Sequence, residues 1–240
     1  MIARRAEELA PFMVMEVLER AREMERQGED IIHLEVGEPD FSVPSPVKKA
    51  TCRALEEGAT HYTHSLGDIQ LREAICEHYL DAYGLEVKPE QVVVTSGTSP
   101  AMMLAFASLL ERGEEVIVSD PAYACYPNFI KFLGGVPARV PVYEQDGFQY
   151  RVPAIEERIN QKTKAILINS PSNPTGCLIS EVDMKAIAGL SPYIISDEIY
   201  HGLVYEGQEH SILEFTDRAF VLNGFSKLYA MTGYRLGYLI

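Results

Sequence analysis

The fold of this chain is best indicated by residues 193–200, which read Tyr-Ile-Ile-Ser-Asp-Glu-Ile-Tyr. Residues 193–196 have the character of a β-strand and deliver Asp197 to its carboxyl end, with Tyr200 three positions later. Ligands bind at this end of the strands in open α/β sheets, so both side chains are candidates for a functional site. An Asp-Glu pair after an apolar strand is also typical of nucleotide hydrolases. Those enzymes need a glycine-rich loop ending in Gly-Lys-Ser/Thr, and the sequence contains none.

Short strands rich in Val and Ile recur along the chain on both sides of this stretch. They are predicted at residues 91–95, 115–119, 137–142, 164–168, 193–196 and 219–222, with helical segments between them, and residues 237–240 also read as a strand. This alternation predicts an α/β fold, with a mostly parallel sheet covered by helices on both faces. A Rossmann dehydrogenase has a similar rhythm, but no Gly-x-Gly-x-x-Gly follows any predicted strand.

Two loops that follow predicted strands carry further polar residues. Residues 169–176 contain two prolines and a glycine, which exclude a helix and hold Asn173 in an extended conformation before a proline. Its amide is then available as a hydrogen-bond donor. Residues 96–100 lie between a strand and a predicted helix at 101–110, and they include Gly97, Thr98 and Ser99. A helix N-terminus of this kind favours anions, although the hydroxyls could equally serve as helix caps.

Lys227 follows the apolar strand 219–222 within a turn of small residues, and Arg235 lies eight positions later. Burial and a cationic neighbour both lower the pKa of an amine, and a neutral amine can form a Schiff base with an aldehyde. Together with Asp197, Asn173, Tyr200 and an anion site, this lysine supplies the groups that pyridoxal 5′-phosphate needs. These are an amine for the aldehyde, a carboxylate for the ring nitrogen, donors for the phenolic oxygen, and a cup for the phosphate.

Five motifs in sequence order resemble the signature of the class I/II aminotransferases, which are pyridoxal-phosphate enzymes of fold type I. They are Gly-Glu-Pro-Asp-Phe at 37–41, Asn-Pro-Thr-Gly at 173–176, Asp-Glu-Ile-Tyr at 197–200, Ser-Lys at 226–227 and Gly-Tyr-Arg-Leu-Gly at 233–237. The resemblance runs through the whole chain. It implies an enzyme that moves an amino group between an L-amino acid and a 2-oxo acid, through a Schiff base on Lys227.

The resemblance also implies a role for each matching residue. Lys227, Asp197 and Tyr200 would be catalytic: the lysine moves the proton, the aspartate pairs with the pyridine nitrogen, and the tyrosine donates to the phenolic oxygen together with Asn173. The phosphate would be bound by Gly97, Thr98, Ser99, Ser226 and Arg235, and the ring of Tyr123 would stack on the pyridine. Gly37 would meet the substrate carboxylate. Tyr62 would reach the cofactor phosphate of a neighbouring subunit, so a homodimer is implied.

The resemblance predicts two domains, and a chain that is shorter than the family's usual length. Residues 1–45 would form an N-terminal arm and part of a small domain, and residues 46–240 an incomplete large cofactor-binding domain. Within these regions the sequence pattern predicts helices at 12–27, 47–57 and 66–83, and a short strand at 31–36. Family members continue past residue 240, through most of the small domain, and carry a second carboxylate-binding arginine there. Because the small domain helps to close the site over substrate, we expect little or no activity from the 240-residue chain.

Composition restricts the partners and the location. The chain has 35 acidic and 21 basic side chains, a net charge of −14 that argues against nucleic acid or an anionic membrane as partner. No apolar segment approaches the length of a membrane span, and no signal peptide is recognisable. Metal binding is not expected either, because His61 and His64 have no third ligand nearby. The four cysteines lie at no disulfide or metal spacing and fit a reduced, cytoplasmic protein: Cys52, Cys76, Cys125 and Cys177.

Two alternatives to amino transfer remain open at this level. A carbon–sulfur β-lyase on the same scaffold would use the same lysine and differ only in the step after proton removal. The chain could also be an inactive truncated form that only binds a partner. The sequence does not identify the amino donor.

Overall fold

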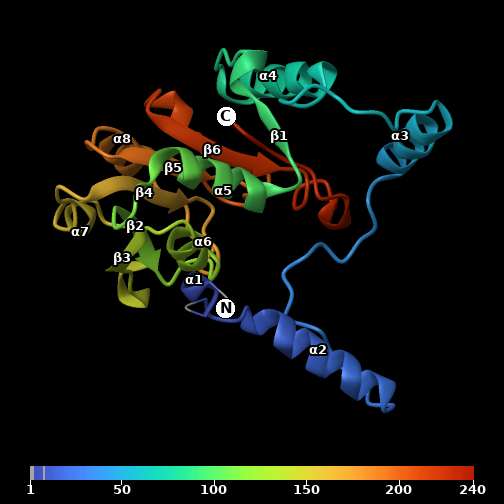
Figure 1. Cartoon of the computed structure of the whole chain (residues 1–240), viewed down its shortest axis with the longest axis horizontal. Coiled ribbons are helices and arrows are strands. Elements are labelled where there is room, and N and C mark those ends of the chain that lie inside the picture. Colours follow the sequence, from blue (N-terminus) through green and yellow to red (C-terminus); the bar gives the residue numbers. More distant parts are fainter. Residues whose placement is uncertain (1–2, 8) are drawn as a thin grey trace.

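In the computed structural model, which describes residues 3–7 and 9–240, the chain is built around one seven-stranded sheet (Figure 1). The strand order is β1-β7-β6-β5-β4-β2-β3. The bounds are β1 (Val93–Thr95), β2 (Glu115–Asp120), β3 (Val136–Pro141), β4 (Thr163–Asn169), β5 (Tyr193–Asp197), β6 (Ala219–Gly224) and β7 (Gly237–Leu239). The pairs β2–β3, β2–β4, β4–β5 and β5–β6 are parallel, which confirms the predicted mostly parallel sheet. Within this sheet, β7 runs antiparallel to its neighbours β1 and β6.

Two hydrophobic layers, one on each face of the sheet, hold helices against it. On one face, α5 (Thr98–Leu109) and α6 (Tyr126–Phe132) pack Phe106 and Ile130 against alternate strand residues such as Val116 and Val118. On the other face, α4 (Ile69–Tyr83), α7 (Val152–Glu156) and α8 (Glu181–Ala188) pack against the intervening residues, Ile117 among them. Since side chains alternate across a strand, one apolar run supplies both layers.

Local sequence features decide where two of these helices begin. The prediction of a helix from residue 66 was wrong by three residues, because the Asp68 side chain accepts a hydrogen bond from Gln70 N and caps α4 at Ile69. Gly84, in the left-handed conformation, ends this helix. Helix α5 begins at Thr98, three residues earlier than predicted, because Pro100 is accepted in the first turn of a helix.

The N-terminal segment extends away from the sheet (Figure 1). It contains α1 (Arg4–Glu7) and α2 (Met13–Arg26), the latter close to the predicted helix at 12–27. The strand predicted at 31–36 is absent from the structure, where these residues are extended but unpaired. Ile32 and Leu34 are 85% and 88% exposed. A strand needs a hydrogen-bonded neighbour, and no described strand lies beside this segment.

The remaining elements are short and connect the larger ones. Helix α3 (Ser45–Glu56) is close to the prediction at 47–57 and lies apart from the sheet in Figure 1. It contacts residues near the C-terminus of the chain, since Thr51 Oγ1 lies 3.2 Å from Tyr234 OH. Four single 3₁₀ turns are η1 (Pro89–Gln91), η2 (Glu144–Asp146), η3 (Ile212–Glu214) and η4 (Thr232–Tyr234). Among the described residues, no helix combines the length and apolar character needed to cross a bilayer.

Candidate active site

The carboxyl edge of the sheet gathers most of the predicted site residues. Asn169 at the end of β4 lies opposite Asp197 at the end of β5, and Asp197 lies opposite Leu222 of β6. Gly237, where β7 begins, is paired on one side with Gly224 of β6 and on the other with Thr95 of β1. The loops that follow these strand ends therefore meet along one edge, as expected for a ligand site in an α/β sheet.

Asp197 is a buried carboxylate with a tyrosine partner that the sequence did not reveal. Its Oδ2 accepts a hydrogen bond of 2.8 Å from Tyr126 OH, and its Oδ1 accepts one of 3.3 Å from Ile199 N. Burial raises the pKa of the Asp197 carboxyl from 3.8 to about 6, although both hydrogen bonds oppose the shift. The only signal for Tyr126 was its place three residues after Tyr123. A carboxyl with this pKa is largely ionised at neutral pH, so it can face a cationic ligand as a carboxylate.

Asn173 and Tyr200 form a hydrogen-bonded pair beside Asp197. Asn173 Nδ2 donates to Tyr200 OH at 3.0 Å, which leaves the tyrosine O–H free to donate to a ligand. Asn169 holds this arrangement in place: its Oδ1 accepts from Asn173 N at 2.7 Å and its Nδ2 donates to the Asp197 carbonyl at 2.8 Å. Burial raises the pKa of Tyr200, and the Asn173 hydrogen bond opposes that shift. Asn169, a polar residue at a strand end, was not singled out from the sequence.

Lys227 lies in the turn after β6, with its Nζ 5.9 Å from the centre of the Tyr200 ring. Nζ donates a 2.5 Å hydrogen bond to the carbonyl oxygen of Gly37, which brings the N-terminal segment to the edge of the sheet. Burial lowers the pKa of the Lys227 amine, and the nearby Arg235 charge lowers it further, whereas Glu38 and Asp197 raise it. The net effect is a lowered pKa of the Lys227 amine, as the sequence predicted. A lowered pKa favours the neutral, nucleophilic form of an amine.

The start of α5 and the Arg235 guanidinium lie together at the other end of the edge. Gly97 precedes α5 with φ +94°, and a Cβ placed on it would lie 2.6 Å from Arg235 Nη2. Arg235 is itself in the left-handed region, φ 52°, and its Nη1 donates to the Thr232 carbonyl. The first backbone N–H groups of a helix have no partner within it, so Thr98 and Ser99 offer donors to an anion beside the guanidinium.

The other predicted residues are placed less decisively. Tyr123 is half-buried, with its ring edge-to-face against Tyr126 at 5.2 Å and against Phe12 of the N-terminal segment at 6.0 Å. Ser226 is half-buried in the Lys227 turn. Tyr62 is fully exposed to solvent in the single chain. The roles of these three residues, and of Gly37 in binding a substrate carboxylate, stay predictions.

The groups at this edge fit pyridoxal 5′-phosphate in kind and in order. A buried carboxylate, an amide–phenol pair and a lysine amine with a lowered pKa lie at or just after the carboxyl ends of the adjacent strands β4, β5 and β6. A helix N-terminus with an arginine lies beyond them, next to a glycine whose missing side chain leaves room for the guanidinium. Among the described residues, no group of three or more His, Cys, Asp and Glu side chains could hold a metal ion.

Replacing Gly97 by alanine should disturb both stability and anion binding. The new Cβ would strain a backbone at φ +94° and displace Arg235 from the start of α5. We expect the free energy of unfolding to fall by about 1–2 kcal/mol, measured by urea denaturation. Because the resemblance assigns Arg235 to the cofactor phosphate, we also expect the dissociation constant for pyridoxal 5′-phosphate to rise about tenfold.

Gly28→Ala is the matched control for this change. Gly28 has nearly the same backbone angle, φ +96°, but no atom lies within 4 Å of its missing Cβ. The Gly28→Ala variant should therefore show the cost of backbone strain without any loss of anion binding. Equal cofactor affinities for the two variants would mean that Arg235 does not depend on Gly97.

Comparison with known proteins identifies relatives along the whole chain. Residues 29–240 match the family described as aminotransferase class I and II. The chain is 44% identical to the (5-formylfuran-3-yl)methyl phosphate transaminase of Methanocaldococcus jannaschii, with 100% of this chain and 64% of that protein aligned. It is 40% identical to a probable aspartate/prephenate aminotransferase of Aquifex aeolicus, covering 99% and 63%. The Thermus thermophilus aspartate aminotransferase solved with maleate is 38% identical and superimposes with a TM-score of 0.97, covering 100% and 64%. The chain thus spans less than two thirds of the length of these relatives.

Proposed function

The chain belongs to the class I and II aminotransferases, and from this membership we propose that it serves pyridoxal-phosphate-dependent transfer of an amino group between an L-amino acid and a 2-oxo acid. The observation that carries the proposal is the position of Lys227, Asp197 and the Asn173–Tyr200 pair at one edge of the sheet. Each is the chemical group that one part of the cofactor requires.

When bound, the cofactor would supply an electron-accepting ring that stabilises negative charge on the substrate α-carbon. Asp197 would hold a proton on the ring nitrogen, because a buried carboxylate facing a cation in a dry site interacts with it strongly. Tyr126 would keep that carboxylate oriented through its 2.8 Å hydrogen bond. Lys227 Nζ would hold the aldehyde carbon covalently and, once released by substrate, carry the proton to and from the α-carbon.

Further groups would position the cofactor and the substrate. The Tyr200 hydroxyl, which already accepts a hydrogen bond from Asn173, would donate to the phenolic oxygen. Tyr123 would offer a flat ring for the pyridine to stack on. The backbone of Gly37 would form part of the site for the substrate carboxylate. It lies next to Lys227, whose Nζ donates a hydrogen bond to the Gly37 carbonyl oxygen. The phosphate would be bound by the side chains of Arg235 and Ser226. It would also be bound at the N-terminus of α5, which is formed by Gly97, Thr98 and Ser99.

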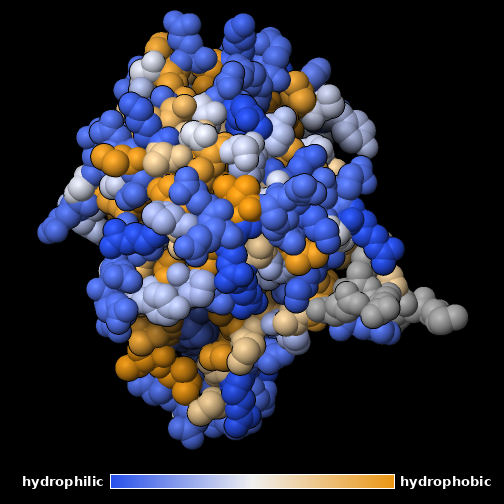
Figure 2. Space-filling view, turned by 90° about the vertical axis from the view of Figure 1, so that its left-hand side faces the viewer, coloured by the Kyte–Doolittle hydropathy of each residue, from blue (hydrophilic) through white to orange (hydrophobic). Residues whose placement is uncertain are grey.

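We further propose that the protein acts as a homodimer in which Tyr62 reaches the phosphate in the partner's site. The support is the exposed apolar surface of α2 and the segment after it, which includes Met13, Ile32, Leu34 and Phe41. In Figure 2 hydrophobic residues gather at the lower end of the molecule, the end at which α2 lies in Figure 1. Exposed apolar patches of this kind are typical of association surfaces.

The division into residues 1–45 and 46–240 is part of the same proposal. Residues 46–240 carry the sheet and its helices, whereas residues before 46 touch the sheet domain at a few points such as Lys227–Gly37 and Thr232–Glu38. A small domain that closes over substrate is consistent with such loose contacts. We also propose a cytoplasmic location, where the four unpaired cysteines would stay reduced.

An amino-donor panel tests the proposed activity. The protein is purified at its native length, loaded with pyridoxal 5′-phosphate and offered 2-oxoglutarate with aspartate, alanine or an aromatic amino acid as donor. We expect glutamate to form with at least one donor at a rate well above that of free cofactor. Release of pyruvate and ammonia from a donor, without glutamate, would instead point to elimination chemistry and contradict the proposal.

A further inference from the structure

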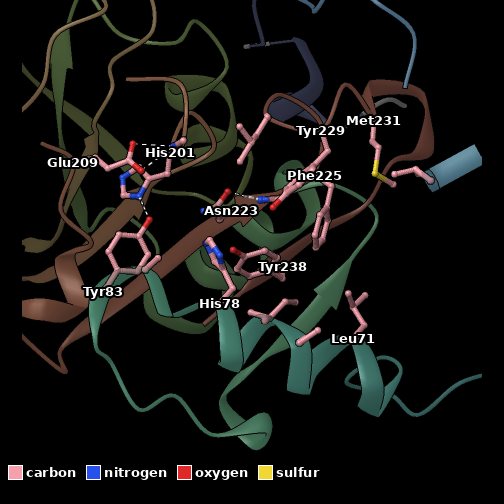
Figure 3. A pocket seen from close by; sticks show the side chains of 17 residues that line it. Leu71, His78, Tyr83, His201, Glu209, Asn223, Phe225, Tyr229, Met231 and Tyr238 are labelled. Carbon is pink, nitrogen blue, oxygen red and sulfur yellow. Dashed lines mark hydrogen bonds between the residues drawn. The ribbon is translucent and has the colours of Figure 1, made fainter. Parts of the chain in front are cut away.

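His201, the residue after Tyr200, is a buried histidine to which the proposed chemistry assigns no role. Its side chain faces away from Asp197: Asp197 bonds to Tyr126 from α6 on one face of the sheet, whereas His201 bonds to Tyr83 from α4 on the other. Figure 3 shows His201 at the wall of a cavity of about 410 Å³, joined by a dashed line to Tyr83. The residue is only 5% exposed.

Both ring nitrogens of His201 have partners, and the chemistry of the partners fixes the proton. Nε2 lies 3.0 Å from the carbonyl oxygen of Ser170, which can only accept, so Nε2 carries a hydrogen and donates it. Nδ1 lies 2.7 Å from the Tyr83 hydroxyl. The imidazole is therefore held between α4 and the loop that follows β4, the loop that presents Asn173.

A buried carboxylate supports the ring from a third side. Glu198 Oε2 lies 3.7 Å from His201 Nδ1 and has no hydrogen bond among the described residues. The other oxygen, Oε1, accepts three hydrogen bonds, from the hydroxyls of Ser196 and Ser211 and from Ile212 N. Glu198 is thus fixed by the strand and the η3 turn, and its Oε2 is directed at the imidazole. A ring with three fixed neighbours cannot rotate without breaking one of these contacts.

We propose that His201 is a positioning residue that holds the loop 170–176, and through it the Asn173–Tyr200 pair, in the geometry that the cofactor's phenolic oxygen needs. The coupling is short. His201 is bonded to Tyr200 through the chain and to Ser170 through Nε2, and Asn173 Nδ2 closes the path back to Tyr200 OH. The effect on the cofactor rests on the proposed function, but the effect on the loop does not.

Hydrogen exchange of the cofactor-free chain tests the loop directly. Two amides of the loop are held by its own hydrogen bonds, Ser172 N to Cys177 O and Gly176 N to Ser172 O, and Ile179 N is held by Ser170 Oγ. In His201→Leu these three amides should exchange about five- to tenfold faster, as expected when a buried hydrogen bond to the loop is lost. His201→Gln, which retains an amide N–H donor and an acceptor oxygen, should stay within about twofold of the parent.

His78→Leu is the control, because His78 lines the same cavity and packs against Tyr79 and Tyr83 rather than against residues 170–176. It should leave the exchange of the loop unchanged. If His201→Leu loses its cooperative thermal transition, Tyr83→Phe carries the same test, with an expected increase of about two- to threefold. Parent-like exchange in the folded variant used would overturn the proposal.

A second measurement reaches the cofactor. The dissociation constant for pyridoxal 5′-phosphate, titrated by fluorescence, should rise about three- to tenfold in His201→Leu and recover in His201→Gln. Equal cofactor affinities in the parent, His201→Leu and His201→Gln would show that His201 does not position the cofactor, even if the loop exchanges faster in His201→Leu. If the parent chain itself does not bind the cofactor, the proposed function fails, while the exchange of the loop still decides the role of His201.

Discussion

Lys227→Ala should abolish the visible absorbance of the cofactor-loaded protein, because the proposed covalent attachment that would give rise to it needs the Nζ that this change removes. Borohydride reduction should no longer fix the cofactor to the chain, as judged by mass spectrometry of the denatured protein. Residual binding should persist, since Arg235 and the N-terminus of α5, which we propose to bind the phosphate, are untouched. Amino transfer should fall by roughly 10⁴- to 10⁶-fold, the scale at which removal of a nucleophile acts in other enzymes.

The matched control is Lys185→Ala, a lysine exposed on α8, which should keep the absorbance and the reducible adduct. A Lys227→Ala protein that still absorbs in the visible range like the parent would place the attachment elsewhere. The adduct would then be located by digestion and sequencing of the labelled peptide. Such a result would contradict the central assignment of the site, whatever the activity.

Asp197→Asn should stabilise the cofactor-free chain at neutral pH while weakening its hold on the cofactor. The carboxyl has a pKa of about 6 in the folded chain, above the 3.8 of an ordinary aspartate. Between these pH values the folded chain binds more protons than the unfolded chain, so the free energy of unfolding falls as pH rises from about 4 to 6. This loss of stability is nearly complete once the pH is well above about 6. An asparagine side chain does not titrate, so Asp197→Asn avoids the loss.

The expected gain of Asp197→Asn over the parent is on the order of 3 kcal/mol at about pH 7.5 and close to zero at about pH 3.5. Urea denaturation of the two proteins at a series of pH values measures it, with Asp217→Asn, at an exposed position, as the control for removing a carboxyl group. In the loaded protein the same change should weaken cofactor binding and reduce amino transfer at least about 100-fold, because a neutral amide cannot hold the ring nitrogen protonated. Parallel pH curves for Asp197→Asn and the parent would show that the buried carboxyl does not destabilise the fold.

The opposed effects on stability and binding have one origin. Asp197 accepts hydrogen bonds from two neutral donors of the chain, Tyr126 OH and Ile199 N. A buried charge without a countercharge is costly, and it persists at functional sites where a ligand supplies the opposite charge. Lys227 shows the complementary feature, since burial and the Arg235 charge lower the pKa of its amine more than Glu38 and Asp197 raise it.

Local patterns in the amino-acid sequence were enough to predict the strands, the edge at which they present their polar residues, and most of the side chains gathered there. A short Val/Ile run followed by Asp197, Asn173 or Lys227 indicates both the strand and its end. The same local logic was wrong at residues 31–36, which have the pattern of a strand but no neighbouring described strand to pair with. It also missed the cap at Asp68, which sets where α4 begins.

Contacts between distant residues became visible only in the folded chain. Tyr126 is 71 positions from Asp197, and Tyr83 is 118 positions from His201, and neither pairing has a periodicity or motif that would announce it. The antiparallel insertion of β7 between β1 and β6, which brings Arg235 to Gly97, is likewise a matter of strand order. Strand order and long-range hydrogen bonds depend on how whole elements pack, whereas sequence patterns report only the neighbours a few residues away.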